Sequence, residues 1–161
     1  MHYRLLESPI GALLLAGDQA GLRLLLFTKG RDQRVKPEPE WEPDRGALKD
    51  AARQLTEYFS GRRRTFDLRL APVGTPFQQT VWSALQKLPY GETTTYGELA
   101  RRIGNPKAVR AVGLANGSNP ISIVIPCHRV IGSNGSLVGY GGGLPIKQAL
   151  LSLERGQRRL L

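Results

Sequence analysis

The stretch "TTTYGELARRIGNPKAVRAVGLANGSNP", residues 93–120, predicts two short helices joined by a tight turn. Thr95 and Glu98 have the spacing of a capping box at the start of the first helix, and a glycine follows its last apolar residue. Asn105 and Pro106 then supply a cap and a first-turn proline for the second helix, which runs to another glycine. Two short helices around such a turn are the pattern of a helix-turn-helix.

The second predicted helix presents small side chains, with Lys107 near its start and one long cation, Arg110, projecting from it. Small residues let a helix backbone approach a surface closely, and that surface is either DNA or another helix. The arginine either enters a groove or a base stack, or it is simply solvated. The pattern alone leaves these alternatives open. The small residues are Ala108, Ala111, Gly113 and Ala115.

The first 70 residues predict a small sheet with one helix. Short apolar runs separated by turn signals indicate strands, and an alternating run at residues 65–70 indicates one more. Residues 30–46 are polar and proline-rich and predict a surface loop. An apolar stripe from Leu48 to Phe59 has helical spacing. The N-terminal strands are expected within residues 3–8, 11–17 and 22–27.

A segment rich in proline and glycine, residues 71–76, separates this part from a mostly helical remainder. Thr75 and Gln78 form a second capping box at the start of the first helix beyond it. We therefore predict an α+β chain of two domains. The first, over residues 1–72, is a small sheet-plus-helix domain, and the second, over residues 73–161, is mostly helical with the helix-turn-helix.

The composition favours an anionic partner. The 161-residue chain carries 23 Lys and Arg against 13 Asp and Glu, and its net charge of +10 favours nucleic acid first. One cysteine excludes an internal disulfide, and with two histidines it argues against a zinc site, so we expect no metal. We expect a reducing, cytoplasmic setting. No apolar run approaches the length of a membrane span, so no membrane partner is expected.

The only cysteine, Cys127, lies in "NPISIVIPCHRVIGSNG", residues 119–135. The apolar run 121–125 reads as a buried strand, and Pro126 ends it. If that strand continued, the side chains of Cys127 and His128 would point to opposite faces, so the pair acts together only if the chain turns there. A buried, inert thiol and an activated nucleophile are the two interpretations of this stretch.

A glycine cluster and a carboxylate follow the cysteine. The cluster "GYGGG", residues 139–143, allows backbone to approach a ligand closely around Tyr140. A helix beginning near Pro145 then ends at Glu154, where a carboxylate gains nothing from the helix dipole. This position indicates a partner for the carboxylate, such as a histidine, or else a solvated glutamate.

Together these stretches resemble the O6-alkylguanine-DNA alkyltransferases, a family of direct-reversal DNA-repair proteins. The resemblance rests on "PCHRVIG", "RAVGLANGSNP", "TYGELA", "GNPKAVR" and "GYGGG…K…LL…E" and covers residues 73–155. The N-terminal "SPIGALLLAG" and "YFSGRRRTFDLRL" resemble the family's ribonuclease H-like domain more loosely. Alkyltransferase-like relatives have no cysteine in this motif. Because this chain keeps Cys127, the resemblance implies transfer chemistry as well as recognition.

The resemblance implies that Cys127 takes the alkyl group from O6 of guanine, and also from O4-alkylthymine, in duplex DNA. A stable thioether forms, so each molecule reacts once, without a cofactor. His128 would be the general base, acting through a water, and Glu154 would orient it. Asn119 matches the family's hinge asparagine, whose side chain bonds to local backbone.

The resemblance also implies the pocket for the base. Tyr96 would donate to the guanine ring as negative charge develops there. Backbone groups of Cys127 and Val130 would accept the exocyclic amine, and backbone of the Tyr140–Gly141 segment would contact O6. Some relatives have serine where Gly141 stands, so the side-chain part of that contact differs here.

A base inside a duplex is out of reach, so the resemblance implies that the nucleotide flips out. Arg110 would fill the gap in the stack, and the helix with Ala108 and Gly113 would lie in the minor groove, beside Lys107. The implied partner is double-stranded DNA that contains O6-alkylguanine, with no obligatory protein partner.

Two other functions compete with this one. A cysteine hydrolase using Cys127 and His128 would turn over repeatedly and would not need a basic helix-turn-helix. A non-enzymatic helix-turn-helix DNA-binding protein would tolerate loss of Cys127.

Overall fold

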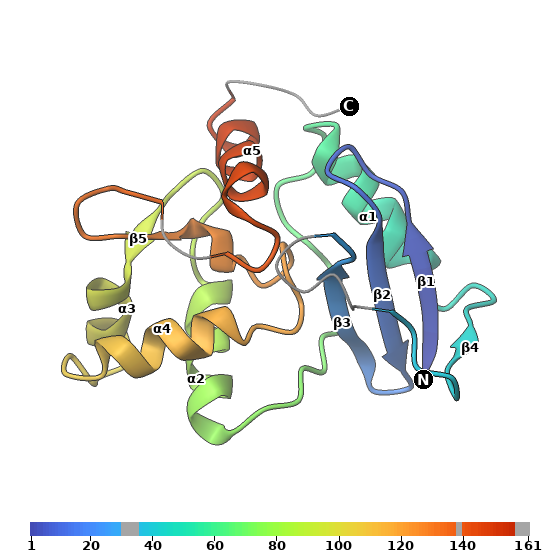
Figure 1. The fold of residues 1–161 in the computed structure, drawn as a ribbon, viewed down its shortest axis with the longest axis horizontal. Coiled ribbons are helices and arrows are strands. Elements are labelled where there is room, and N and C mark those ends of the chain that lie inside the picture. The colour runs from blue at the N-terminus through green and yellow to red at the C-terminus, as the bar shows by residue number, and fades with distance from the viewer. Residues whose placement is uncertain (30–35, 138–139, 157–161) are drawn as a thin grey trace.

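The computed structural model describes residues 1–29, 36–137 and 140–156, and its N-terminal part is a sheet of order β3-β2-β1-β4 (Figure 1). β1 pairs antiparallel with β2, β2 pairs antiparallel with β3, and the short β4 runs parallel to β1. The three predicted N-terminal strands are confirmed, and β4 lies in the segment predicted as loop. The bounds are β1 His2–Leu6, β2 Leu13–Asp18, β3 Gly21–Phe27 and β4 Glu42–Pro43.

Helix α1, Lys49–Phe59, packs beside this sheet with Leu55, Tyr58 and Phe59 buried, as the stripe predicted. The strand predicted at residues 65–70 is wrong, because only Leu70 forms a bridge, with Leu22 of β3.

A side chain explains why that strand does not form. Asp67 exchanges hydrogen bonds with the buried side chain of Gln54 on α1, donating from its backbone N to Oε1 and accepting at its carbonyl from Nε2. These backbone groups are therefore satisfied without a strand ladder.

The C-terminal part is mostly helical, which confirms the α+β class. α2 begins after Thr75, whose hydroxyl and backbone exchange hydrogen bonds with Gln78 in the predicted capping box. No helix among the described residues is long and apolar enough to cross a membrane. The bounds are α2 Pro76–Gln86, β5 Thr94–Thr95, α3 Tyr96–Arg102, α4 Val109–Gly117, η1 Cys127–Arg129, β6 Val130–Ile131 and α5 Leu144–Glu154.

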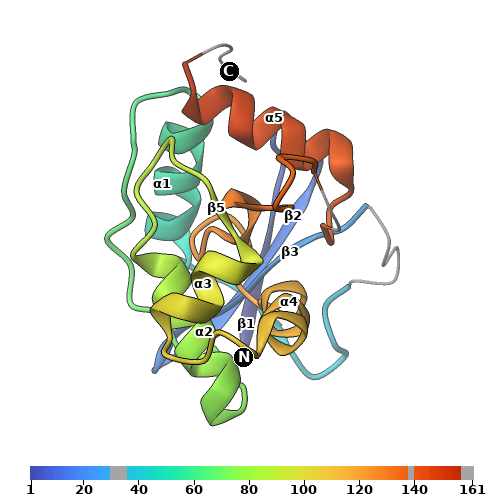
Figure 2. The same cartoon turned by 90° about the vertical axis from the view of Figure 1, so that its left-hand side faces the viewer.

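Helices α3 and α4 pack against each other on the side of the molecule away from the four-stranded sheet (Figure 1), and this side faces the viewer in Figure 2. Thr95 caps α3 by accepting from the backbone N of Glu98, but the Glu98 side chain pairs with arginines on its own helix, so only half of the predicted box forms. The predicted cap at Asn105 is wrong. The backbone N of Ala108 bonds the carbonyl of Asn105 and closes a separate turn, so α4 begins only at Val109.

The apolar run 121–125 is buried but is not a strand, which corrects that prediction. After one bridge between Ile121 and Leu25 of β3, the chain turns, and Ile123 takes a left-handed φ of 70°. The backbone N of Ile125 then bonds the carbonyl of Ile121. A β-branched residue is strained in this region, so close packing must hold it there. The bridge ties the segment before Cys127 to the edge of the N-terminal sheet.

Candidate active site

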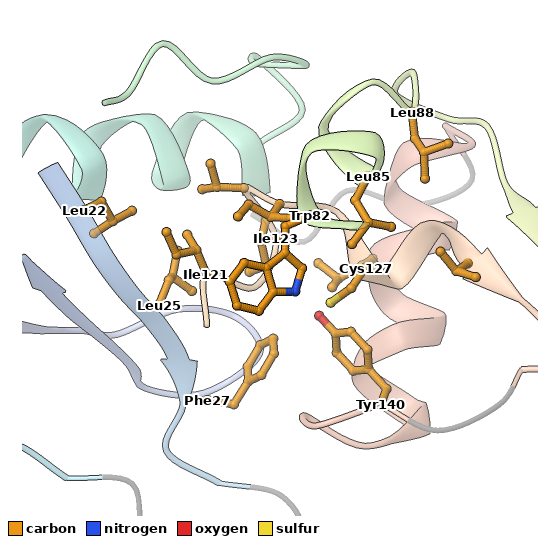
Figure 3. Packing of buried hydrophobic residues seen from close by; sticks show 14 of the residues in the cluster. Leu22, Leu25, Phe27, Trp82, Leu85, Leu88, Ile121, Ile123, Cys127 and Tyr140 are labelled. Atoms are coloured by element: carbon orange, nitrogen blue, oxygen red, sulfur yellow. The ribbon is translucent and has the colours of Figure 1, made fainter. Parts of the chain in front are cut away.

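Cys127 opens η1, a single 3-10 turn. The chain therefore does turn at this point, which is the condition for Cys127 and His128 to act together. The backbone N of Cys127 bonds the carbonyl of Ile125, and that of Arg129 bonds the carbonyl of Pro126. The thiol is buried between α2 and α5, near the indole of Trp82, and the hydroxyl of Tyr140 points toward it (Figure 3). No hydrogen bond joins Cys127 directly to His128 among the described residues.

Asn119 shapes the loop that carries the cysteine. Its side-chain Nδ2 donates to the carbonyl of Ile125 at 2.7 Å, and its Oδ1 accepts from the backbone N of Ile121 at 3.0 Å. Both bonds are buried, and they close the segment between Asn119 and Pro126. The amide thus holds the left-handed turn and sets the direction from which the chain enters η1.

Glu154, at the end of α5, is the centre of a buried hydrogen-bond network. Its Oε2 accepts from Tyr58 Oη at 2.6 Å, from His128 Nε2 at 2.7 Å and from Arg129 Nη2 at 3.0 Å. Its Oε1 accepts from Arg129 Nε at 2.7 Å and from the backbone N of Gly91 at 3.2 Å. The carboxylate at the helix end therefore has the histidine partner that the sequence indicated, and an arginine besides.

This network fixes the charge of the carboxylate. Burial raises the pKa of Glu154, but the hydrogen bond from His128 and the hydrogen bonds and positive charge of Arg129 outweigh burial and hold that pKa far below its ordinary value of 4.5. Because an ionised carboxylate only accepts hydrogen bonds, Nε2 of His128 carries a proton. Burial in turn lowers the pKa of His128, and Glu154 opposes that effect. The imidazole is therefore neutral near pH 7, with Nδ1 as its acceptor.

His128 Nδ1 is the atom with base character in this site. The ring is fully buried, and Nδ1 has no hydrogen-bond partner among the described residues. A neutral imidazole held by a carboxylate at Nε2 presents a fixed lone pair at Nδ1. The arrangement is a base with its orienting group, which is half of what an activated nucleophile requires.

The groups around the sulfur have opposing effects on the thiol. Burial raises the pKa of the Cys127 thiol, while a hydrogen bond from the Asn119 side chain and the charge of Lys147 lower it in part. Lys147, on α5, is buried and donates from Nζ to the carbonyl of Val130 at 2.6 Å. The thiol is therefore protonated at rest, and the charge of Lys147 stabilises the thiolate once the proton leaves.

Two of the residues predicted to form the base pocket, Tyr96 and Tyr140, lie near this sulfur. Tyr96 is half-buried at the start of α3, and burial, then the neighbouring Cys127, raise its pKa. A Cβ on Gly113 of α4 would lie 3.8 Å from the Tyr96 ring, so the two helices meet closely here. The buried hydroxyl of Tyr140 has no partner among the described residues. Gly141 is exposed and has open space around it.

The residues predicted to bind DNA lie on one exposed region. Lys107 and Arg110 are exposed, Ala108 and Gly113 are half-buried, and Leu114 is 70% exposed on the same helix. The structure thus brings Gly113 of α4 next to Tyr96. Gly139, from the predicted glycine cluster, lies outside the described residues.

Sequence reasoning missed three residues of the site: Tyr58 and Arg129, which bond Glu154, and Lys147, which bonds the carbonyl of Val130. Arg129 lies inside the motif "PCHRVIG", next to His128. Lys147 stands seven residues before Glu154, so Lys147 and Glu154 fall on the same face of α5. That spacing is a signal that could have found Lys147. Tyr58 comes from α1, far away in the sequence, and nothing local marks it.

Glu154 holds the network together, so we expect Glu154→Gln to lower the free energy of unfolding by about 3–5 kcal/mol, the usual cost of removing one partner from a buried ion pair. Arg129 would stay buried without its anion. Urea denaturation at neutral pH measures the change. The control is Glu98→Gln, because Glu98 pairs with Arg101 and Arg102 at the surface, where we expect a stability near that of the parent.

The pH dependence of this difference has a definite sign. Because folding depresses the pKa of Glu154, its stabilising contribution is complete above the ordinary value of 4.5 and is lost as the pH falls below it. The difference in the free energy of unfolding between the parent and Glu154→Gln should therefore become smaller in acid. A difference in the free energy of unfolding that becomes larger in acid, or a variant as stable as the parent at neutral pH, contradicts the role of the ion pair.

A buried thiol beside an oriented histidine, next to two exposed basic helices, defines a cysteine-nucleophile protein built to act at a nucleic-acid surface. A family model described as the DNA-binding domain of 6-O-methylguanine DNA methyltransferase matches residues 76–156, and the ribonuclease-like domain of the same family matches residues 1–72. The chain belongs to the 6-O-methylguanine DNA methyltransferase family.

Individual relatives agree with this. The methylated-DNA–protein-cysteine methyltransferase of Methanosarcina acetivorans is 55% identical over 154 residues, which is 96% of this chain and 98% of the relative. The crystal structure of Mycobacterium tuberculosis OGT in complex with DNA is 52% identical, with a TM-score of 0.90 over 98% of this chain and 94% of that one. The fold extends further, to O6-methylguanine-DNA methyltransferase of Pyrococcus kodakaraensis, 23% identical with a TM-score of 0.65 over 95% of this chain and 98% of that one.

Proposed function

We propose that this protein repairs DNA directly, by moving the alkyl group of O6-alkylguanine in duplex DNA onto Cys127 in one irreversible turnover. The observation that carries the proposal is the sole thiol, buried beside a neutral His128 that Glu154 orients. The family relatives support the same activity. We extend the substrates to O4-alkylthymine and propose a cytoplasmic location, as the sequence implied.

In the proposed reaction, the Cys127 thiol loses its proton through a water to His128 Nδ1. The thiolate attacks the alkyl carbon, the carbon–oxygen bond breaks, and its electron pair leaves with guanine. Tyr96 donates its phenolic proton toward the guanine ring as negative charge builds there. The resulting imidazolium is stabilised by Glu154. A thioether remains on Cys127, and no step removes it, so the protein is consumed.

The base pocket is proposed to lie between α3 and the segment after the cysteine. Backbone groups of Cys127 and Val130 would accept the exocyclic amine of guanine, and the backbone at Tyr140 and Gly141 would contact O6. The bond from Lys147 to the Val130 carbonyl supports this, because it fixes the direction of that carbonyl. At Gly141 the open space leaves room for a larger alkyl group than a side chain there would allow.

The DNA partner would bind through α3, its turn and α4 acting as a helix-turn-helix. We divide the chain into domains at residues 1–72 and 73–161, with DNA on the second. The small residues Ala108, just before α4, and Gly113, on α4, would let the helix backbone enter the minor groove, where contacts to phosphates and groove shape give little sequence preference. A flipped nucleotide would then reach Cys127 past Tyr96.

The stoichiometry of repair tests the proposed function. Excess duplex DNA with one O6-methylguanine is incubated with the protein, and the remaining O6-methylguanine is measured by nucleoside chromatography. We expect repair to stop when one lesion per protein molecule has been removed. Continued turnover would identify a hydrolase, and unchanged DNA would identify a binding protein without activity, so either result contradicts the proposal.

Arg110 separates binding from base flipping. We expect Arg110→Ala to react nearly normally with free O6-benzylguanine, which needs no flipping, and about one to two orders of magnitude more slowly with duplex DNA. The reason is that extruding a base costs a few kcal/mol, which the arginine would offset by filling the stack. The measurement is the ratio of the two rates, variant over parent.

Lys107→Ala is the matched control, because Lys107 is an exposed cation just before the same helix. We expect it to weaken binding to any DNA and to reduce the salt dependence by about one unit of slope, without changing the ratio of rates. An equal loss of rate on free base and duplex for Arg110→Ala would show that the arginine supports the fold or the pocket. The proposal that it fills the base stack would then be abandoned.

A further inference from the structure

The N-terminal part of the molecule is hydrogen-bonded directly to the carboxylate that orients His128. Tyr58 lies on α1, and its hydroxyl donates to Glu154 Oε2 at 2.6 Å. Both residues are buried, with Tyr58 0% and Glu154 6% exposed. Among the described residues before residue 73, Tyr58 is the one whose side chain hydrogen-bonds Glu154. The sheet-and-helix part therefore bonds the buried network around Glu154 through this short hydrogen bond.

The ring of Tyr58 already has a packing role that does not need the hydroxyl. Its centroid lies 5.6 Å from that of Phe59, 5.5 Å from that of Phe66 and 6.2 Å from that of Tyr90. Phenylalanine would make the same contacts. A hydroxyl placed in this apolar cluster costs free energy unless it is paired, so its alignment on the carboxylate is a specific feature.

The oxygen that Tyr58 binds is the oxygen that orients the base. Oε2 of Glu154 accepts from Tyr58 and from His128 Nε2, while Arg129 contacts both carboxylate oxygens. Hydrogen bonds to one oxygen compete for the same charge. The donation from Tyr58 therefore weakens the pull of Oε2 on the proton of His128 and, at the same time, fixes the carboxylate in position.

We propose that Tyr58 is a positioning residue for alkyl transfer, through which the N-terminal part aligns Glu154 and keeps His128 neutral. This inference rests on the proposed function of the site. Without the hydroxyl, Oε2 bears more charge, the imidazolium form of His128 is better stabilised, and more of the base is already protonated at a given pH.

The other charged and titratable groups near His128 are unchanged when only this hydroxyl is removed. They are Arg129 from η1, Lys147 and Glu154 from α5, and the phenols of Tyr90 and Tyr140 beside the carboxylate. A change in the titration of His128 is thus assignable to the Tyr58 hydroxyl.

The first test is the pH profile of Tyr58→Phe in single-turnover transfer from free O6-benzylguanine, from about pH 5 to about pH 8, the range in which histidine usually changes charge. We expect the acid limb to move up by about half to one pH unit, so that the variant is about threefold to tenfold slower on that limb. Near pH 8 its rate should approach that of the parent. Duplex DNA should show the same shift, because the Tyr58 hydroxyl acts on His128 and not on the flipping step.

Tyr90→Phe is the matched control. Tyr90 stands in the same aromatic cluster, but its hydroxyl faces the carbonyl of Leu153 at 3.4 Å. We expect its profile to coincide with that of the parent. A loss by the same factor at every pH in Tyr58→Phe, or an equal shift in Tyr90→Phe, would mean that the hydroxyl only supports packing, and would overturn the inference.

A second readout does not depend on transfer at all. The chain has two histidines, His128 and the exposed His2, so ¹⁵N imidazole spectra are simple to assign. We expect the titration of His128 to move to higher pH in Tyr58→Phe. Identical His128 titration curves in the two proteins would overturn the inference, whether or not the protein transfers alkyl groups.

Discussion

Cys127→Ser is expected to transfer no alkyl group, yet to bind duplex DNA with O6-methylguanine as tightly as the parent. The hydroxyl of serine is a far weaker nucleophile toward a soft alkyl carbon, and its much higher pKa puts the oxyanion beyond the reach of His128. Substrate binding depends on α3, α4 and the pocket, none of which the exchange of one atom alters. Transfer is measured by nucleoside chromatography and binding by fluorescence anisotropy.

The comparison requires that the variant folds, and the melting temperature checks this. Serine is nearly the size of cysteine, so the packing around Trp82 and Tyr140 should survive (Figure 3). Retained methyl transfer by Cys127→Ser would exclude the thiol as acceptor. Loss of both transfer and binding in a folded variant would instead assign Cys127 to substrate recognition.

His128→Ala is expected to slow transfer by about two to four orders of magnitude, the usual contribution of a general base. The thiol would then have to lose its proton to solvent, against the burial that raises its pKa. We therefore expect the rate of the variant to keep rising with pH across the range in which the parent has levelled off, because the thiolate fraction grows with pH.

His2→Ala is the matched control for this variant, since His2 is the other histidine of the chain and is exposed on β1. It should transfer at the rate of the parent. A His128→Ala variant that reacts as fast as the parent would show that proton transfer from Cys127 to His128 is unnecessary. A slow variant whose rate does not depend on pH would point to a damaged pocket.

The parts of the fold that were predicted from the sequence are those that local patterns determine. The strands β1 to β3 and the helix α1 follow from apolar spacing, and the cap of α2 follows from Thr75 and Gln78. The failures have tertiary causes. Gln54 satisfies the backbone at Asp67 in place of a strand ladder. The turn after the bridge to Leu25 changes the run 121–125 from a strand to a compact loop.

The candidate site divides in the same way. The motif around Cys127 predicted the nucleophile, and the position of Glu154 at a helix end predicted that it has a partner. Sequence adjacency did not show how the chain turns after Pro126, and η1 answers that question. The contact from Tyr58 depends on how α1 packs against the end of α5, which no local pattern encodes.

The mass of the intact protein after incubation with O6-methylguanine duplex tests the central claim most directly. The account predicts a gain of one CH₂ unit per molecule, with no further gain on longer incubation or with more DNA. Fragmentation should place it on Cys127, and the same treatment of Cys127→Ser should leave its mass unchanged. An unmodified protein beside repaired DNA, or an adduct on another residue, would contradict the account.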